Sequence, residues 1–202
     1  MAKPIRPRRL PNEAYRDEEF LVEDDVLAVA KAAGSFGRHG DRDRAMIILA
    51  FHHGLRCTET VKLKWERINM EREDLWVFRV KGSLSGRHPF IPGDAAALLK
   101  LHPAESGWVF KSEPERDSGH VSESGFQKIV ERAGERAKLK YPIHPHMLRH
   151  SCGFWLRKQG HEIMDIRDWL GHKSVKNTER YAKAGPDRFR EIGIGRITGG
   201  RS

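Results

Sequence analysis

The stretch Ile143-His-Pro-His-Met-Leu-Arg-His-Ser-Cys-Gly-Phe154 combines a helix start with several ring nitrogens and a guanidinium. Pro145 suits the first position of a helix, because its missing N–H would have no partner there in any case. We therefore expect a helix from Pro145 to Gln159, ended by Gly160.

One face of this helix offers a histidine and an arginine side by side. His146 and Arg149 are three residues apart, so a helix places both on the same face. An imidazole beside a guanidinium suits a phosphate, because the arginine offers two parallel donors and the histidine donates or holds a proton. A metal is the alternative, since His146 and His150 have the four-residue spacing of zinc ligands. No glutamate follows His146, and Arg149 would repel a cation, so we expect no metal site.

Beyond this helix, Leu170-Gly171-His172 forms a turn, and Tyr181 follows nine residues after the histidine. A loop histidine and a helical tyrosine can both face one cleft. The alternative is a tyrosine packed in the core with its hydroxyl bonded, which is the commoner environment of this residue type.

Upstream, Gly54-Leu-Arg-Cys-Thr-Glu59 places Arg56 between the end of one expected helix and the start of the next. Helix N-termini present free N–H groups that favour anions, so Arg56 is a candidate anion ligand. The alternative is a surface arginine paired with Glu59. A hairpin follows, with Lys81 ending its first strand and Arg87 across the turn. A lysine there can swing into a cleft, although such a lysine more often only adds solubility.

The remaining patterns predict a mainly α-helical domain with a small three-stranded antiparallel sheet, of the α+β class. Helices are expected over 23–33, 41–53, 58–63, 95–101, 124–138, 145–159, 162–170 and 174–181. Strands are expected over 75–80 and 88–91, with 107–110 as the third short strand. Four helix starts have expected caps: Asp41, Asp94, Ser174, and a capping box of Ser124 with Gln127.

Composition limits the class of protein. The chain has 202 residues with 37 Lys and Arg against 28 Asp and Glu, a formal net charge of +9. This balance favours a polyanionic partner, nucleic acid before membrane. The longest apolar run, 45–51, is far shorter than the ~20 residues of a membrane span. With no signal peptide and only Cys57 and Cys152, we expect a soluble cytoplasmic protein.

The N-terminus is a basic segment of its own. Residues 1–16 contain three prolines and five basic side chains, at Lys3, Arg6, Arg8, Arg9 and Arg16. We expect residues 1–17 to form an extended arm in which Arg6, Arg8 and Arg9 contact DNA. The folded domain is expected over 18–185, followed by a C-terminal tail over 186–202.

Taken in chain order, these patterns resemble the active-site series of the tyrosine recombinases, the phage integrase family. The members of the series are Arg56, Lys81, His146, Arg149, His172 and Tyr181. The family pattern is a Gly-Leu-Arg-x-x-Glu turn, a hairpin lysine, a His-x-Leu-Arg-His box, a Leu-Gly-His turn and a tyrosine nine residues later. The likeness covers residues 18–185, and residues 108–110 and 143–154 are most similar to the small fimbrial phase-variation invertases.

The resemblance implies the tyrosine recombinase catalytic-domain fold and a site-specific DNA recombinase. Tyr181 would attack a DNA phosphate and form a 3′-phosphotyrosine. Arg56 and Arg149 would hold the non-bridging oxygens, and His172 would donate to the same phosphate. His146 would position the phosphate and accept the tyrosine proton.

Two further roles are implied. Lys81 would protonate the leaving 5′-oxygen. The hairpin turn between Lys81 and Arg87 leaves open which of these two residues reaches that oxygen. Arg87 is also a candidate DNA contact. Glu59 would support Arg56, and no metal or other cofactor is implied.

The resemblance also implies the partners. These are double-stranded DNA, further copies of the chain forming a tetramer in the synaptic complex, and DNA-bending accessory proteins, all at the nucleoid. The tail over 186–202 would pass between protomers. Many family members carry an N-terminal core-binding domain, whereas only residues 1–22 precede the first expected helix here. We expect a naturally short member that grips DNA with its catalytic face and its arm.

Three other activities remain open at this point. One is a nicking–closing enzyme similar to type IB topoisomerases, which would use the same residues. Another is a DNA-binding regulator that keeps the fold without catalysis, and the last is a metal-dependent hydrolase built on the histidines. The DNA site, and the choice between inversion, integration and excision, also remain open.

Overall fold

Helix α2, Gly40–His52, is the central element of the computed structural model, which describes residues 20–79, 83–112 and 119–182. Its apolar residues from Ala45 to Phe51 are all buried. They are covered by α1, Glu23–Gly34, and by helices that come much later in the chain. The helix expected over 41–53 is thus present and buried along its apolar run, and α2 carries the chain from the α1 side of the domain to the turn at Gly54.

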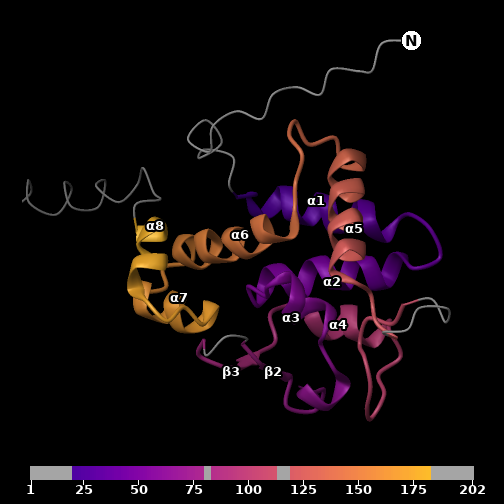
Figure 1. Ribbon diagram of the computed structural model, residues 1–202, viewed down its shortest axis with the longest axis horizontal. Helices are drawn as coiled ribbons and strands as arrows, with labels where there is room; N and C mark the ends of the chain where they lie inside the picture. The colour runs from indigo at the N-terminus through magenta and orange to yellow at the C-terminus, as the bar shows by residue number, and fades with distance from the viewer. Residues whose placement is uncertain (1–19, 80–82, 113–118, 183–202) are drawn as a thin grey trace, which may run out of the picture.

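The other helices lie on several sides of α2 (Figure 1). One side holds α1 and α5, another holds α6, α7 and α8, and the short helices α3 and α4 lie below α2 in this view. The bounds are α3 Cys57–Val61, α4 Asp94–Leu99, α5 Glu123–Arg136, α6 Pro145–Lys158, α7 Ile163–Leu170 and α8 Glu179–Ala182. Two short 3-10 helices, η2 Trp65–Arg67 and η3 Val175–Asn177, connect them.

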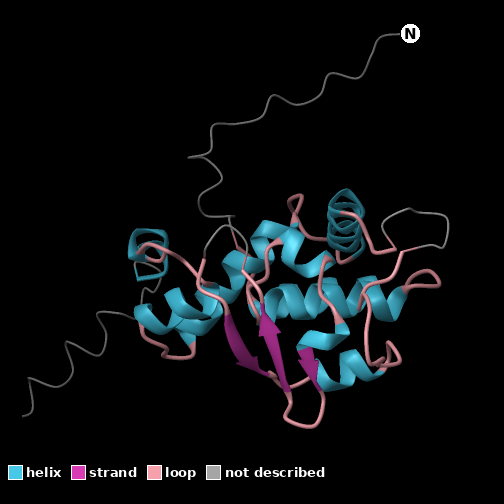
Figure 2. Ribbon diagram, turned by 60° about the horizontal axis from the view of Figure 1, so that its bottom comes forward, coloured by secondary structure: helices cyan, strands magenta, loops and turns pink. Residues whose placement is uncertain are grey.

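A three-stranded antiparallel sheet lies along one edge of the helices (Figure 2). Its strands are β1 Ile68–Asn69, β2 Asp74–Val77 and β3 Gly86–Pro89, in the order β1-β2-β3. Leu75 pairs with His88 on the buried face, while Trp76 pairs with Arg87 on the exposed face. The fold class expected from the sequence is thereby confirmed.

The third strand is a different segment from the one expected. Residues 107–110 do not join the hairpin: the Trp65 N–H donates to Gly107 O at 2.9 Å, and the Val109 N–H donates to Leu63 O at 3.0 Å. Trp108 makes an isolated bridge with Lys64. The segment therefore pairs with the chain before η2, and β1 takes the place beside β2.

Three expected helix starts are also corrected. Helix α2 begins at Gly40 with His39 as its N-cap, so Asp41 lies inside the first turn and does not cap the helix. Ser122, not Ser124, caps α5 by accepting the Gly125 N–H at 3.1 Å. Gly93 caps α4, and the buried Asp94 carboxylate accepts hydrogen bonds from His52 and His53 at 2.6 and 2.9 Å. These hydrogen bonds hold the pKa of Asp94 at about 2 although burial alone would raise it.

The last expected helix is divided in two. Ser174 caps η3 by accepting the Lys176 N–H at 3.3 Å, and α8 begins again at Glu179. The break places Thr178 between the two pieces, fully buried. Among the described residues, no helix is both long enough and apolar enough to cross a membrane.

Candidate active site

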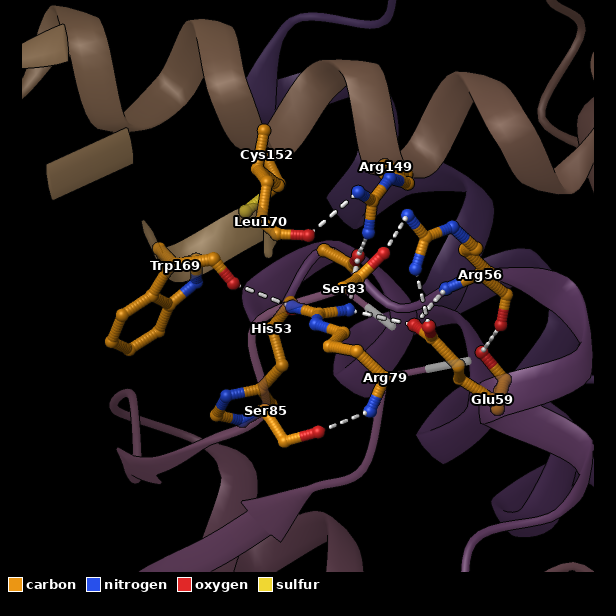
Figure 3. A network of polar contacts seen from close by, with 12 residues as sticks. His53, Arg56, Glu59, Arg79, Ser83, Ser85, Arg149, Cys152, Trp169 and Leu170 are labelled. Carbon is orange, nitrogen blue, oxygen red and sulfur yellow. Dashed lines mark hydrogen bonds and ion pairs between the residues drawn. The ribbon is translucent and has the colours of Figure 1, made fainter. Parts of the chain in front are cut away.

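Arg56 stands at the turn between α2 and α3. Its backbone N–H and its Nη1 both donate to the Glu59 carboxylate, at 2.9 and 2.6 Å, and its Nη2 donates to Ser83 at 3.3 Å (Figure 3). Gly54 makes this turn possible, because its φ is 55° and a Cβ there would lie 2.3 Å from Leu170. The turn is thus packed directly against the end of α7.

Arg149 reaches the same turn from the buried face of α6. Its Nη2 donates to Leu170 O at 2.7 Å and its Nη1 donates to Gly54 O at 2.5 Å. Burial, together with the charges of Arg79 and Arg56, lowers the pKa of Arg149 to about 9. An anion bound here would offset this crowding of positive charge.

A third guanidinium, Arg79, lies beneath these two and was not anticipated as a site residue. It follows β2, and its side chain is fully buried. It donates to the Glu59 carboxylate at 2.7 Å and to Gly54 O at 3.0 Å. Strand alternation was the available signal, because Leu75, Val77 and Arg79 share the inward face of the strand.

His172 follows the end of α7 directly. Gly171 has a φ of 66°, and a Cβ there would lie 2.6 Å from Leu84 O, so the turn requires glycine. The His172 Nδ1 is bonded to the Thr178 hydroxyl at 3.0 Å. Partial burial lowers the pKa of His172 to about 4, aided by the charge of Arg149.

Tyr181 is packed in the core, with 1% of its surface exposed. Its ring lies edge-on to Phe154 at 5.0 Å and nearly parallel to His172 at 6.5 Å between ring centroids. A Cβ on Gly153 would lie 2.5 Å from the Tyr181 ring, so glycine at that position makes the room for it. The hydroxyl is 3.1 Å from His150 Nδ1.

His150 is therefore a site residue that the sequence suggested only as a metal ligand. Its Nε2 is 3.3 Å from Arg180 Nη1. Because a guanidinium only donates, Nε2 accepts, and a neutral ring then carries its proton on Nδ1, facing the Tyr181 oxygen. Burial lowers the pKa of His150 to about 3, which keeps the ring neutral.

His146 contacts the same group through His150. The two rings meet edge to face, with 4.3 Å between centroids. Partial burial lowers the pKa of His146 to about 4, and the charge of Arg149 acts in the same direction. The structure thus places His150, rather than His146, beside the tyrosine hydroxyl. Across the described residues, no cluster of His, Cys, Asp and Glu is arranged to hold a metal ion.

Comparison with known proteins identifies the family of this chain. The sequence profile described as the phage integrase family matches residues 19–188, which is most of the chain. The chain belongs to the phage integrase family.

Relatives within the family support this at the sequence level. The type 1 fimbriae regulatory protein FimB of Escherichia coli K12 is 34% identical over 181 residues, covering 86% of this chain and 88% of FimB. FimE of the same strain is 29% identical over 177 residues, covering 84% and 88%. The expected likeness to small fimbrial proteins is confirmed.

Solved structures support the fold. The XerA recombinase superposes with a TM-score of 0.69 at 23% identity, covering 86% of this chain and 63% of XerA. The catalytic domain of bacteriophage HP1 integrase superposes with a TM-score of 0.62 at 20% identity, covering 91% and 98%. The described residues therefore have the expected catalytic-domain fold of this family.

Of the remaining expected site residues, Arg87 is the one within the part of the chain that the structure describes. Lys81, and the arm residues Arg6, Arg8 and Arg9, fall outside the described residues. Arg87 is half exposed and forms an ion pair with Asp74 at 3.0 Å. It points to the sheet face opposite its neighbour His88, whose ring packs on Trp169 at 4.0 Å. Arg87 is thus directed away from the residues gathered around Gly54.

Proposed function

We propose that this tyrosine site-specific recombinase exchanges DNA strands through a 3′-phosphotyrosine formed at Tyr181. One observation carries the proposal: residues far apart in the sequence meet around the turn at Gly54. Arg149 reaches Gly54 O and Leu170 O, two residues before His172, and His172 in turn lies beside Tyr181. A tyrosine can act as the nucleophile in phosphoryl transfer from DNA, and an arginine pair with a histidine can stabilise the charge of the transition state.

The charge of the site suits a phosphodiester. Arg56, Arg79 and Arg149 gather around a single described carboxylate, Glu59, which leaves an excess of positive charge. A guanidinium has five N–H donors, and the contacts described above occupy only some of those on Arg56 and Arg149. The other donors would bind the two non-bridging oxygens and stabilise the charge of the pentacoordinate transition state.

Two histidines would complete the phosphate site and the nucleophile. If the Thr178 hydroxyl donates to His172 Nδ1, the ring proton sits on Nε2, where it can donate to the phosphate. His150 Nδ1–H would stabilise the Tyr181 oxygen as its proton leaves. His146 is the proposed proton acceptor, because a bound phosphate would raise its pKa, and Tyr181 would move toward it.

The bond changes balance without an external reactant. The Tyr181 oxygen forms a bond to phosphorus, the bond from phosphorus to the 5′-oxygen breaks, and that oxygen takes a proton. We assign this proton to Lys81, since Arg87 is paired with Asp74 on the far face of the sheet. Attack by another 5′-hydroxyl on the phosphotyrosine then rejoins the strands, so neither a metal ion nor ATP takes part.

The assembly and its biological outcome belong to the same proposal. Four protomers on two duplex sites would pass their tails over 186–202 between them, with DNA-bending proteins assisting at the nucleoid. The arm over 1–17 would lie along phosphates outside the catalytic domain, 18–185. We favour inversion of a DNA segment over integration. The sequence resembles the small fimbrial invertases, and the fimbriae regulatory proteins FimB and FimE match over 86% and 84% of this chain.

The test starts by finding the DNA site. Fragments of the genome that encodes this chain are incubated with the protein in EDTA. The reaction is stopped with detergent, and the fragments that stay covalently bound to protein are sequenced. We expect one inverted-repeat site to be enriched, and a nicked suicide duplex of that site to form a covalent adduct in EDTA. A requirement for Mg²⁺ or Zn²⁺ in cleavage would contradict the mechanism, and sequence-independent relaxation of any plasmid would indicate a topoisomerase.

A further inference from the structure

Arg79 is the most heavily bonded buried side chain around the site, and the family assignment gives it no role. Its Nη1 and Nη2 together contact four acceptors, which belong to three separate segments (Figure 3). These are Gly54 O and His53 O at the end of α2, Glu59 on α3, and Trp169 O on α7, at 2.5–3.0 Å. Its own backbone N–H donates to Ser85, on the far side of the hairpin turn, at 3.0 Å.

The first consequence concerns Arg56. Glu59 accepts from Arg79 through one carboxylate oxygen, and it accepts from Arg56 through both. Although burial alone would raise it, the charge of Arg79 and hydrogen bonds from Arg56 hold the pKa of Glu59 below its ordinary value. Arg79 thus keeps Glu59 ionised and in place, and Glu59 in turn orients the Arg56 side chain.

The second consequence concerns Arg149. Gly54 O accepts from both Arg79 and Arg149. On α7 the two arginines donate to successive carbonyl oxygens: Arg79 donates to Trp169 O, and Arg149 donates to Leu170 O. Both carbonyls that orient Arg149 therefore belong to segments that Arg79 holds.

The third consequence concerns the turn to His172. A Cβ on Gly171 would lie 2.8 Å from Arg79 Cγ, so this turn rests directly on the aliphatic part of the Arg79 side chain. Arg79 also stands two residues before Lys81 in the sequence. One buried side chain thus contacts the segments that carry Arg56 and His172.

We infer that Arg79 is a positioning residue for strand cleavage, which aligns Arg56 and Arg149 on the scissile phosphate by fixing Glu59 and the Gly54 and α7 carbonyls. It acts through these groups and does not touch the phosphate, since each of its two terminal nitrogens already donates to two protein acceptors. On Arg149 each terminal nitrogen donates to one, which leaves donors for a phosphate. The inference rests on the proposed function, because it concerns the rate of that cleavage step.

Arg79→Lys is the informative variant. A lysine keeps the charge beside Glu59, but one ammonium cannot span acceptors in three segments as a planar guanidinium does. We expect single-turnover cleavage of a saturating suicide duplex to fall about 100-fold, the effect of misplacing catalytic groups by ~1 Å. The dissociation constant for DNA should change less than about threefold, because Arg56 and Arg149 keep their charges.

A double-mutant cycle separates positioning from a purely structural role. If Arg79 acts through both arginines, then Arg79→Lys should slow an Arg149→Lys enzyme by only about tenfold, because one of the two aligned groups is already lost. Arg72→Lys is the matched control: Arg72 is 60% exposed, pairs with Asp74 on the sheet, and should keep wild-type cleavage. Circular dichroism at the assay temperature checks that each variant is folded.

Three results would overturn the inference. They are a folded Arg79→Lys protein that cleaves within threefold of wild type, an equal slowing in both backgrounds, or loss of DNA binding in parallel with cleavage. If Arg79→Lys does not fold, Glu59→Gln, which removes the charge through which Arg79 holds Arg56, is combined with Arg56→Lys in the corresponding cycle. Failure of the wild-type protein to form an adduct would instead reject the proposed function.

Discussion

His150 offers the most direct way to test how Tyr181 is activated. The structure places its Nδ1 3.1 Å from the Tyr181 oxygen, with Arg180 near Nε2 at 3.3 Å. Two substitutions separate its possible roles. His150→Ala removes the donor, whereas His150→Asn keeps an N–H close to the position of Nδ1 and cannot act as a base near neutral pH.

The magnitude follows from the chemistry of the phenol. With an ordinary pKa of ~10, a tyrosine is only about 1% ionised at pH 8, so a donor that stabilises the oxygen anion has a large effect. Loss of one preorganised donor to a developing oxyanion costs about 2.7–4 kcal/mol, or 10²–10³ in rate. We expect His150→Ala to cleave about 100-fold more slowly, and His150→Asn to lose about tenfold or less.

The assay is single-turnover cleavage of a saturating suicide duplex between pH 6 and 9. As a donor to the tyrosine oxygen, His150 should shift the rising limb of the pH profile, so His150→Ala should need a higher pH to reach its plateau. Cleavage by His150→Ala within threefold of wild type would refute the reasoning. An Asn variant as slow as the Ala variant would show instead that His150 accepts the proton.

Three further outcomes are expected. Thr178→Val, which leaves His172 Nδ1 without its described partner, should slow cleavage about 10- to 100-fold with DNA affinity kept, and Thr178→Ser should restore it; equal rates would exclude the assigned tautomer. Burial lowers the pKa of His88 to about 2, so the unfolded chain binds the extra proton below pH 6.5, and stability falls as pH falls. As pH falls below 6.5, the free energy of unfolding of His88→Gln, measured with urea, should therefore decrease by about 1.4 kcal/mol less per pH unit than that of wild type. Equal dependence of the two free energies on pH would contradict this. Deleting residues 1–16 should reduce the dependence of log K for DNA on log salt by about 2–4 units at ~0.9 per phosphate contact, with saturated cleavage unchanged; an unchanged slope would show that the arm does not contact DNA.

The short motifs predicted where several candidate residues lie in the fold, because each motif fixes its own local geometry. Gly54 and Gly171 adopt positive φ, and the bulk of Leu170 or Leu84 leaves no room for a side chain at those turns. Local sequence therefore sufficed to place Arg56 and His172 at turns. Pro145 likewise marked the start of α6, which puts Arg149 on the buried face.

Long-range pairing was not accessible in the same way. Residues 107–110 could pair either with the hairpin or with the chain around Leu63, and in the structure they pair with the latter. Strand propensity does not say which partner a segment takes. The contact of His150 with Tyr181 depends on the break at Thr178, which rotates α8 away from a continuous helix. Arg79 was overlooked because a charged residue in a strand is normally exposed, and only three distant acceptor segments make its burial possible.

The central claim is that Tyr181 becomes joined to the 3′ side of a DNA break. The most direct measurement is mass spectrometry of the covalent adduct, formed in EDTA on a suicide duplex labelled separately at each strand end and then digested with protease and nuclease. We expect the peptide containing Tyr181 to carry a 3′-linked nucleotide, and Tyr181→Phe to bind the same duplex without forming any adduct. A nucleotide on another residue such as Tyr141, a 5′ linkage, or an adduct with Tyr181→Phe would contradict the account.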